Sequence, residues 1–161
     1  MLKKILLLSL CISSCTFTAP ISFSEQALND TMVTTEGTTL SFKEVLKVHQ
    51  GKKILVNVWA SWCRDCIVSL PKLRVLQANN SDVSYVFISA DRTSVAWKRA
   101  LKKYKIKGTH YFMENGMDGG FGDFLNSNWI PRYLVLSENG FVDLFKAKKI
   151  TDPRIANALK K

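Results

Sequence analysis

The pattern of hydrophobic and polar positions is clearest in the run Ile54-Leu-Val-Asn-Val-Trp59, where every residue but the asparagine is apolar or aromatic. A short run of this kind is typical of a central β-strand buried on both faces, whose neighbours are expected to be parallel strands joined by helical crossovers. A similar run from Val83 to Ser89 predicts a second strand. Between Val95 and Tyr104, apolar residues recur at helical spacing and predict an amphipathic helix.

Local signals predict further elements around these. The segment Ser41-Phe-Lys-Glu44 has the pattern of a capping box and predicts the start of a short helix. The segments Arg132–Leu136 and Phe141–Phe145 flank an Asn-Gly turn, which predicts a β-hairpin. Pro153 follows a Thr-Asp pair, as at the first turn of a closing helix.

Two segments lack such periodicity. Residues 25–37 are mostly polar and predict a tether that precedes the folded domain. The segment Met113–Gly122 is rich in glycine and predicts a flexible loop close to the functional site. Its glycine spacing fits no phosphate-binding fingerprint. The remaining chain, residues 38–161, has the length of one domain with its own core.

The N-terminus predicts export. Lys3-Lys4 precede the apolar run Ile5–Ile12, which is too short to span a bilayer and is typical of a secretory signal within residues 1–24. Two cleavage points are compatible with the sequence. Ile12-Ser-Ser-Cys15 resembles a lipoprotein signal, with cleavage before Cys15 and a lipid on its thiol, whereas Ser22-Phe-Ser24 resembles an ordinary signal-peptidase site.

Cysteine spacing indicates redox chemistry. Export removes Cys11 and either removes or lipidates Cys15, so that Cys63 and Cys66 remain as partners for each other. Residues three apart on a first helical turn lie on one face, where their thiols can form a reversible disulfide. The start of a helix favours the thiolate of Cys63, which is therefore the expected nucleophile. Cys66, one turn further in, is the expected resolving thiol.

The segment Trp59-Ala-Ser-Trp-Cys63-Arg-Asp-Cys66, with Pro71 five residues later, resembles the active-site signature of the thioredoxin superfamily and most closely its exported TlpA/ResA group. The resemblance implies an α/β thioredoxin fold over residues 38–161, with a central mixed β-sheet flanked by helices on both faces. It implies that Cys63 attacks and Cys66 resolves. It also implies that Trp62 shields the pair, that Pro131 is a cis-proline facing the disulfide, and that Trp62, Ile130 and Pro131 contact the substrate.

Two positions depart from the family. Members of the exported group often carry a glutamate where this chain has Ser69, and thioredoxins carry a buried aspartate where it has Asn57. A carboxylate that relays the proton of Cys66 is therefore missing unless Asp65, Asp91 or a water molecule takes that role.

Charge and histidine content narrow the function. The formal net charge is +10, and the basic residues of Lys98–Lys107 are expected to form the solvated side of a helix, with attraction to an anionic membrane as the second interpretation. No nucleic-acid motif accompanies the charge, so nucleic acid is not an expected partner. His49 and His110 are expected at the surface or in loops, and neither a metal site nor a cofactor is expected.

The resulting prediction is an exported thiol-disulfide oxidoreductase of the periplasm or cell envelope, which reduces disulfides in envelope proteins through a mixed disulfide. A membrane-bound electron donor or acceptor would be its redox partner. Alternatives are a disulfide oxidase or isomerase, a metal-binding module and a non-catalytic binding module. Arg132 and the loop Gly116–Gly122 are the positions expected to discriminate substrates.

Overall fold

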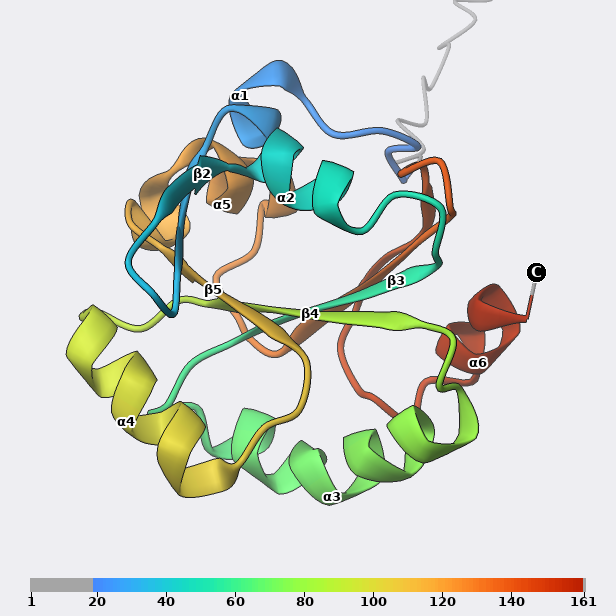
Figure 1. Cartoon of the computed structure of the whole chain (residues 1–161). Coiled ribbons are helices and arrows are strands. Elements are labelled where there is room, and N and C mark those ends of the chain that lie inside the picture. The colour runs from blue at the N-terminus through green and yellow to red at the C-terminus, as the bar shows by residue number, and fades with distance from the viewer. Residues whose placement is uncertain (1–18, 161) are drawn as a thin grey trace, which may run out of the picture.

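A seven-stranded mixed β-sheet forms the centre of the protein in a computed structural model, which describes residues 19–160 (Figure 1). The strand order is β2-β1-β5-β4-β3-β6-β7. The strands are β1 (Thr31–Thr34), β2 (Thr39–Ser41), β3 (Ile54–Trp59), β4 (Ser84–Ser89), β5 (Thr109–Met113), β6 (Arg132–Leu136) and β7 (Val142–Ala147).

Strand β3 lies in the interior of this sheet, and all six of its residues are buried. It pairs in parallel with β4 and antiparallel with β6, so the expectation of parallel neighbours holds on one side only. The antiparallel partner β6 is also buried along its whole length, and it lies inside the sheet between β3 and β7.

Helices cover both faces of the sheet. Helices α3 and α4 lie on one face, α1, α2 and α5 lie on the other, and α6 packs against β6 and β7 (Figure 1). This arrangement confirms the predicted thioredoxin fold. The helices are α1 (Glu25–Leu28), α2 (Phe42–Val48), α3 (Arg64–Asn79), α4 (Ser94–Tyr104), the short 3-10 helix η1 (Gly116–Asp118), α5 (Gly120–Leu125) and α6 (Pro153–Leu159).

The predicted local elements are largely confirmed. The capping box opens α2, with Ser41 and Glu44 bonded reciprocally. The Asn-Gly hairpin joins β6 to β7, and Pro153 occupies the first turn of α6. Within residues 19–160, no helix is both long and apolar enough to cross a membrane.

The tether predicted for residues 25–37 is instead part of the domain. Glu25–Leu28 form α1, and β1 pairs antiparallel with both β2 and β5. Phe23, just upstream, is buried and its ring packs 4.9 Å from that of Phe42. The segment looks polar because β1 buries only Met32 fully and is held mainly by backbone pairing.

The glycine-rich segment is also structured, and the flexible loop predicted for Met113–Gly122 is wrong. Its residues form η1 and the start of α5, and α5 packs against α1. The buried carboxylate of Asp30 holds the segment, since it accepts hydrogen bonds from Asn115 Nδ2 and from the backbone N–H of Phe121, both at 2.9 Å.

Candidate active site

Cys63 and Cys66 form a disulfide at the start of α3, directly beyond the end of β3. Their Cα atoms are 5.3 Å apart. Cys63 is the N-cap of the helix, and its Sγ atom accepts the backbone N–H of Cys66 at 3.2 Å. This hydrogen bond places the sulfur of Cys63 at the positive end of the helix, where developing negative charge on it would be stabilised.

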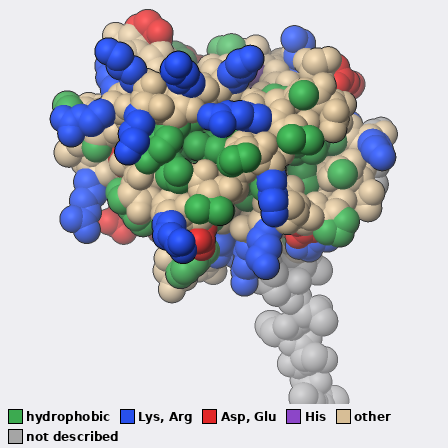
Figure 2. All heavy atoms as spheres, turned by 90° about the horizontal axis from the view of Figure 1, so that it is seen from below, with side chains coloured by type: hydrophobic (Ala, Val, Ile, Leu, Met, Phe, Trp, Pro, Cys, Tyr) green, Lys and Arg blue, Asp and Glu red, His purple; other side chains and the backbone are tan. Residues whose placement is uncertain are grey.

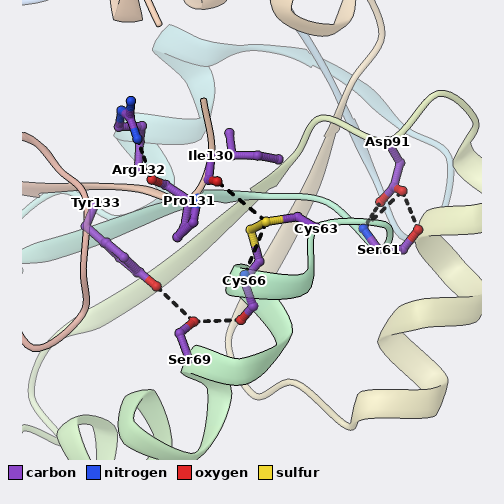
Figure 3. The surroundings of a disulfide bond; sticks show 9 residues. All are labelled: Ser61, Cys63, Cys66, Ser69, Asp91, Ile130, Pro131, Arg132 and Tyr133. Atoms are coloured by element: carbon purple, nitrogen blue, oxygen red, sulfur yellow. Dashed lines mark hydrogen bonds between the residues drawn. A yellow bond between two sulfur atoms is a disulfide. The ribbon is translucent and has the colours of Figure 1, made fainter. Parts of the chain in front are cut away.

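The antiparallel pairing of β3 with β6 brings Pro131 to the same end of the sheet. Val58, near the end of β3, lies opposite Arg132, the first residue of β6. The Ile130-Pro131 peptide bond is cis, as the resemblance implied. The carbonyl oxygen of Ile130 lies 3.6 Å from Sγ of Cys63, so the segment before β6 touches the disulfide directly (Figure 3).

The turn that leads from β3 to the cysteines is fixed by Asp91. This buried carboxylate accepts the backbone N–H of Ser61 at 3.1 Å, the hydroxyl of Ser61 at 2.5 Å and the hydroxyl of Ser89 at 2.8 Å. Figure 3 shows Asp91 and Ser61 on the far side of the disulfide from Tyr133. No hydrogen bond joins Asp91 to either cysteine in the described part of the chain, which favours a positioning role over a proton relay.

Ser69 stands where a glutamate was expected, and its hydroxyl takes part in a network of uncharged hydrogen-bonding groups. Its hydroxyl donates to the carbonyl of Cys66 at 2.6 Å and accepts from the hydroxyl of Tyr133 at 3.0 Å (Figure 3). Burial raises the pKa of Tyr133 to about 12, so its hydroxyl keeps its proton at neutral pH. The network therefore ties the first turn of α3 to β6 without supplying a charge.

Asn57 lies beneath the same helix. It pairs directly with Tyr133 across β3 and β6, and residues directly opposite in a sheet point to the same face. The side chain of Asn57 is buried, and its Oδ1 atom has no hydrogen-bond partner within residues 19–160. Ser69, Tyr133 and Asn57 thus give the α3 side of the disulfide uncharged polar groups where a carboxylate was sought.

Two exposed tryptophans flank the cysteine pair. The side chains of Trp62 and Trp129 are 63% and 58% exposed, although large aromatic residues are usually well buried. Both line one hollow of about 430 Å³ with Cys63 and Ile130. Cys63, which is 6% exposed, lines this hollow, whereas Cys66 is 1% exposed and does not. The division between an attacking and a resolving thiol stays a prediction.

Several residues considered from the sequence lie elsewhere. Arg132 is buried, its guanidinium donates to the carbonyl of Pro131 at 2.9 Å, and the side chain points away from the disulfide (Figure 3). Burial lowers the pKa of Arg132. The segment Gly116–Gly122 packs near α1 on the opposite face from α3. Neither is placed to contact a substrate at the disulfide, so that expectation is wrong.

The histidines are less exposed than expected. His49 is buried at the end of α2, and His110 is half-buried in β5, where it stacks on Phe87. Among residues 19–160, no cluster of three or more His, Cys, Asp or Glu side chains is arranged to hold a metal. The possible lipidation site Cys15 lies outside the described residues.

Sequence comparison relates the chain to known redox proteins. Residues 51–142 match the sequence model of a family described as thioredoxin-like. Thiol-disulfide oxidoreductase ResA of Bacillus cereus is 26% identical over 89 residues, which cover 54% of this chain and 49% of that protein. The soluble secreted antigen MPT53 of Mycobacterium bovis is 28% identical over 91 residues, 56% of this chain and 51% of the antigen. The chain therefore spans about half the length of these curated relatives.

A solved structure extends this similarity over most of the fold. The solution structure of a candidate thiol-disulfide oxidoreductase from Bacteroides vulgatus matches with a TM-score of 0.70 and 30% identity. The match covers 86% of this chain and 89% of that chain. It therefore includes the sheet and helices that position the two cysteines.

Sequence reasoning did not identify several residues of this site. Trp129 carried no signal except its place before Pro131, and Tyr133 looked like an ordinary core position in a strand. Ser61 and Ser89 became informative only through their shared partner Asp91, which lies 30 residues from Ser61 in the chain. The one sequence signal for the contact of Ser61 with Asp91 was that each follows the end of a predicted strand, and that the two strands were expected to be neighbours.

Proposed function

The chain belongs to the thioredoxin-like family, and from this membership and the geometry of its site we propose that it is a thiol-disulfide oxidoreductase that reduces disulfides in exported proteins. The observation that carries the proposal is the disulfide of Cys63 and Cys66 at a helix start, with Cys63 at a surface hollow beside the Ile130-Pro131 segment. Two similar proteins, ResA and the candidate thiol-disulfide oxidoreductase from Bacteroides vulgatus, support the same reaction class.

The reaction begins from the reduced dithiol. The thiolate of Cys63 attacks one sulfur of a substrate disulfide, the substrate S–S bond breaks, and its second sulfur leaves as a thiolate that takes up a proton. The thiolate of Cys66 then attacks the sulfur of Cys63 in the mixed disulfide. This step releases the first substrate sulfur as a thiol and forms the Cys63–Cys66 disulfide. Two electrons pass to the substrate, and a dithiol donor at the membrane returns two electrons to the protein.

The geometry supports each of these roles. The N-cap position of Cys63 stabilises its thiolate as the nucleophile of the first step. The carbonyl of Ile130 lies 3.6 Å from Sγ of Cys63. The Ile130-Pro131 segment is therefore close enough to the reacting sulfur to align the backbone of a bound substrate. Oxidation or isomerisation would use the same atoms in reverse, and the reduction potential of the pair decides between these directions.

Trapping the mixed disulfide tests the reaction. Reduced Cys66→Ser, mixed with native insulin, whose disulfides are intact, and with envelope extracts, is expected to form covalent complexes that dithiothreitol releases. Cys63→Ser is the matched control. It should form no such complex, because its remaining thiol, that of Cys66, is only 1% exposed. Equal trapping by the two variants, or none by either, would contradict the assigned roles. The reduction potential of the wild-type pair, measured in glutathione buffers, then assigns the direction.

Export is the second part of the proposal, and the fold favours one of the two cleavage points. Cleavage after Ser24 would remove Phe23, whose ring lies 4.9 Å from Phe42 and 4.8 Å from Phe124. It would also remove Ile21, whose carbonyl accepts the N–H of Val142 at 2.9 Å. Loss of a buried phenylalanine costs about 3 to 5 kcal/mol. We therefore favour cleavage before Cys15, which leaves these contacts intact and places a lipid on its thiol.

Such an anchor would hold the active site away from the membrane. Ile21 joins the start of β7, beside the end of β6 and the start of β3, whereas the disulfide follows the end of β3. Six residues of β3 span about 20 Å at 3.3 Å per residue. The anchored end and the redox end thus lie at opposite ends of the sheet, which suits reduction of partners that approach from the envelope side.

The mature N-terminus tests this part. Mass spectrometry of the full-length protein from a bacterial membrane fraction is expected to find a lipid-modified chain that begins at Cys15, and Cys15→Ser should move the protein out of that fraction. A mature chain that begins at Glu25 would overturn the anchor. Phe23→Ala, made in the soluble domain, should lower the urea midpoint and provides an independent measure of how much the fold needs this residue.

A further inference from the structure

A second hollow beside the disulfide differs in character from the one lined by Cys63. It has a volume of about 420 Å³ and lies between α3 and the loop that joins β7 to α6. Pro131 and Tyr133 of the β6 segment border it, so it starts next to the redox pair. Its lining residues are Asp65, Val68, Ser69, Lys72, Trp129, Pro131, Tyr133, Lys148, Lys149, Ile150 and Thr151.

Positive charge stands on both walls of this groove. Lys72 projects from α3, and Lys148 and Lys149 project from the opposite loop. All three side chains are exposed, and none forms an ion pair within residues 19–160. Among the described residues, Asp65 is the only acidic one that lines the groove. Asp152, the next acidic residue after the loop, forms an ion pair with Arg154 at 2.6 Å. The lysines are therefore available to an incoming anion.

Apolar surface accompanies the charge. Val68 and Trp129 are 65% and 58% exposed, and with Pro131 and Ile150 they give the groove an uncharged lining beside its lysines. Figure 2 shows that the face covered by α3 and α4 carries many Lys and Arg side chains around a central apolar area and few Asp or Glu side chains. A partner that approaches this face meets a positive field before it reaches the groove.

We propose that this groove binds an acidic segment of the substrate polypeptide and so selects disulfides that have carboxylates nearby and apolar side chains between. The proposal rests on the proposed function, because the groove adjoins the reacting sulfurs. Acidic side chains complement the lysines on both walls, whereas a basic segment would be repelled by them.

The helix geometry also predicts where the acidic residues lie. Lys72 follows Cys63, which bonds the substrate cysteine, by nine residues, and this is about 13.5 Å along a helix axis at 1.5 Å per residue. An extended peptide covers about 3.3 Å per residue, so the preferred carboxylates are about four residues from the substrate cysteine. The positions between would contact Val68 and Trp129.

Peptides with a reporter thiol provide the test. The substrates are synthetic peptides with one cysteine in disulfide linkage to thionitrobenzoate and with Glu, Gln or Lys at the third and fourth positions on either side. Reduced wild-type protein is expected to react about three- to tenfold faster with the Glu peptide than with the Gln peptide, and slowest with the Lys peptide. Because the contacts are solvent-exposed, 0.5 M salt should remove most of this difference.

Variants separate the groove from the overall charge. The triple variant Lys72→Gln, Lys148→Gln, Lys149→Gln is expected to react equally with the Glu and Gln peptides and to keep the wild-type rate with the Gln peptide. The control variant Lys98→Gln, Lys102→Gln, Lys107→Gln removes the same charge from outside the groove and should keep the preference. Equal rates of wild type with the Glu and Gln peptides, or equal loss of preference in both variants, would overturn the proposal.

A binding measurement distinguishes this proposal from the proposed function. Peptides with serine in place of cysteine cannot react, and their affinity for the oxidised protein can be measured by fluorescence anisotropy. If no disulfide peptide reacts while the acidic serine peptide still binds through the three lysines, the groove proposal is supported and the oxidoreductase assignment fails. If the disulfide peptides react without charge preference and no serine peptide binds, the oxidoreductase assignment is supported and the groove proposal fails. Self-association that the triple variant abolishes, without peptide binding, would assign the groove to a second copy of the chain and overturn the proposal.

Discussion

Replacement of Asp91 by alanine is expected to loosen the turn that carries the cysteines. The carboxylate serves three donors, the N–H and hydroxyl of Ser61 and the hydroxyl of Ser89, at distances from 2.5 to 3.1 Å. Hydrogen bonds to a charged acceptor contribute about 1.5 to 3 kcal/mol each, and a buried donor left without a partner costs about 1 to 3 kcal/mol. Water can reach half-buried Ser61 but not fully buried Ser89.

The summed cost of the lost hydrogen bonds is reduced because water can bond to Ser61 and because a buried charge is removed. Asp91→Ala is therefore expected to lower the free energy of unfolding by about 3 kcal/mol. Ser89→Ala removes one of the three donors and should cost about 1 kcal/mol. With a slope of about 2 kcal/mol per molar of urea, the midpoint of the oxidised protein would fall by about 1.5 M in Asp91→Ala. Tryptophan fluorescence follows the transition because Trp59 and Trp97 are buried.

The same variant should slow thiol-disulfide exchange, because Ser61 precedes Cys63 by two residues and its position fixes the start of α3. A folded Asp91→Ala protein at low temperature is therefore expected to reduce the Gln peptide more slowly than Ser89→Ala does. The reasoning would be refuted by a midpoint no lower than that of Ser89→Ala. A large loss of stability with an unchanged exchange rate would refute the link from this network to the redox pair alone.

Two further predictions concern the side chains of Tyr133, His49 and His110. Tyr133→Phe removes the 3.0 Å hydrogen bond to Ser69 and should cost about 1 kcal/mol in urea unfolding, while the shape of the pH–rate profile stays the same, since the pKa of Tyr133 is raised to about 12. Burial lowers the pKa of His49 and of His110 below the ordinary value of 6.5. The unfolded chain then binds more protons just below pH 6.5, so stability is full above that pH and falls on acidification. His49→Gln with His110→Gln should flatten this slope between about pH 5 and 7; a slope unchanged in the double variant would contradict it.

The centre of the fold could be predicted because its signals are local and strong. The apolar run of β3, the cysteine pair that follows it and the Asn-Gly hairpin each specify one element without knowledge of the rest. The antiparallel pairing of β3 with β6 could not be predicted from periodicity. A strand buried on both faces has the same apolar sequence pattern whether its neighbours are parallel or antiparallel. The resemblance, rather than the pattern, supplied the mixed sheet.

The N-terminal strands and α5 could not be predicted because tertiary contacts decide them. Strand β1 is short and its only fully buried residue is Met32. Helix α5 contains Gly120 and Gly122, which are poor helix formers. Both glycines are explained by packing, since a Cβ atom at Gly120 would collide with the backbone of Gln26 and one at Gly122 with the backbone of Met117. At Gly120 the close approach joins two segments far apart in the chain, which leaves no signal in a single sequence.

The missing carboxylate was visible in the sequence, whereas its consequence depends on the structure. Ser69 faces the groove and bonds to Tyr133 and to the carbonyl of Cys66, so this position supplies no charged base. Asp65 lines the same groove, but within residues 19–160 no hydrogen bond joins its carboxylate to Cys66. The proton of Cys66 must then pass to water or to the departing substrate thiolate in the second step. Resolution of the mixed disulfide is therefore expected to accelerate as pH rises and to be slowest with substrates whose leaving thiolate is strongly basic.

Ser69→Glu tests this argument, because it places a base beside Cys66 and within reach of the lysine-lined groove. A general base typically contributes 100-fold or more when well placed, and about tenfold is expected here because position 69 is only half-buried. Stopped-flow measurement of the second step at pH 6 to 7 should show this gain, and Ser69→Gln, which has the same shape without the charge, should show none. If Ser69→Glu leaves the rate and its pH dependence as in the wild type, another group already accepts the proton. The neutral network of Ser69 and Tyr133 would then be structural only.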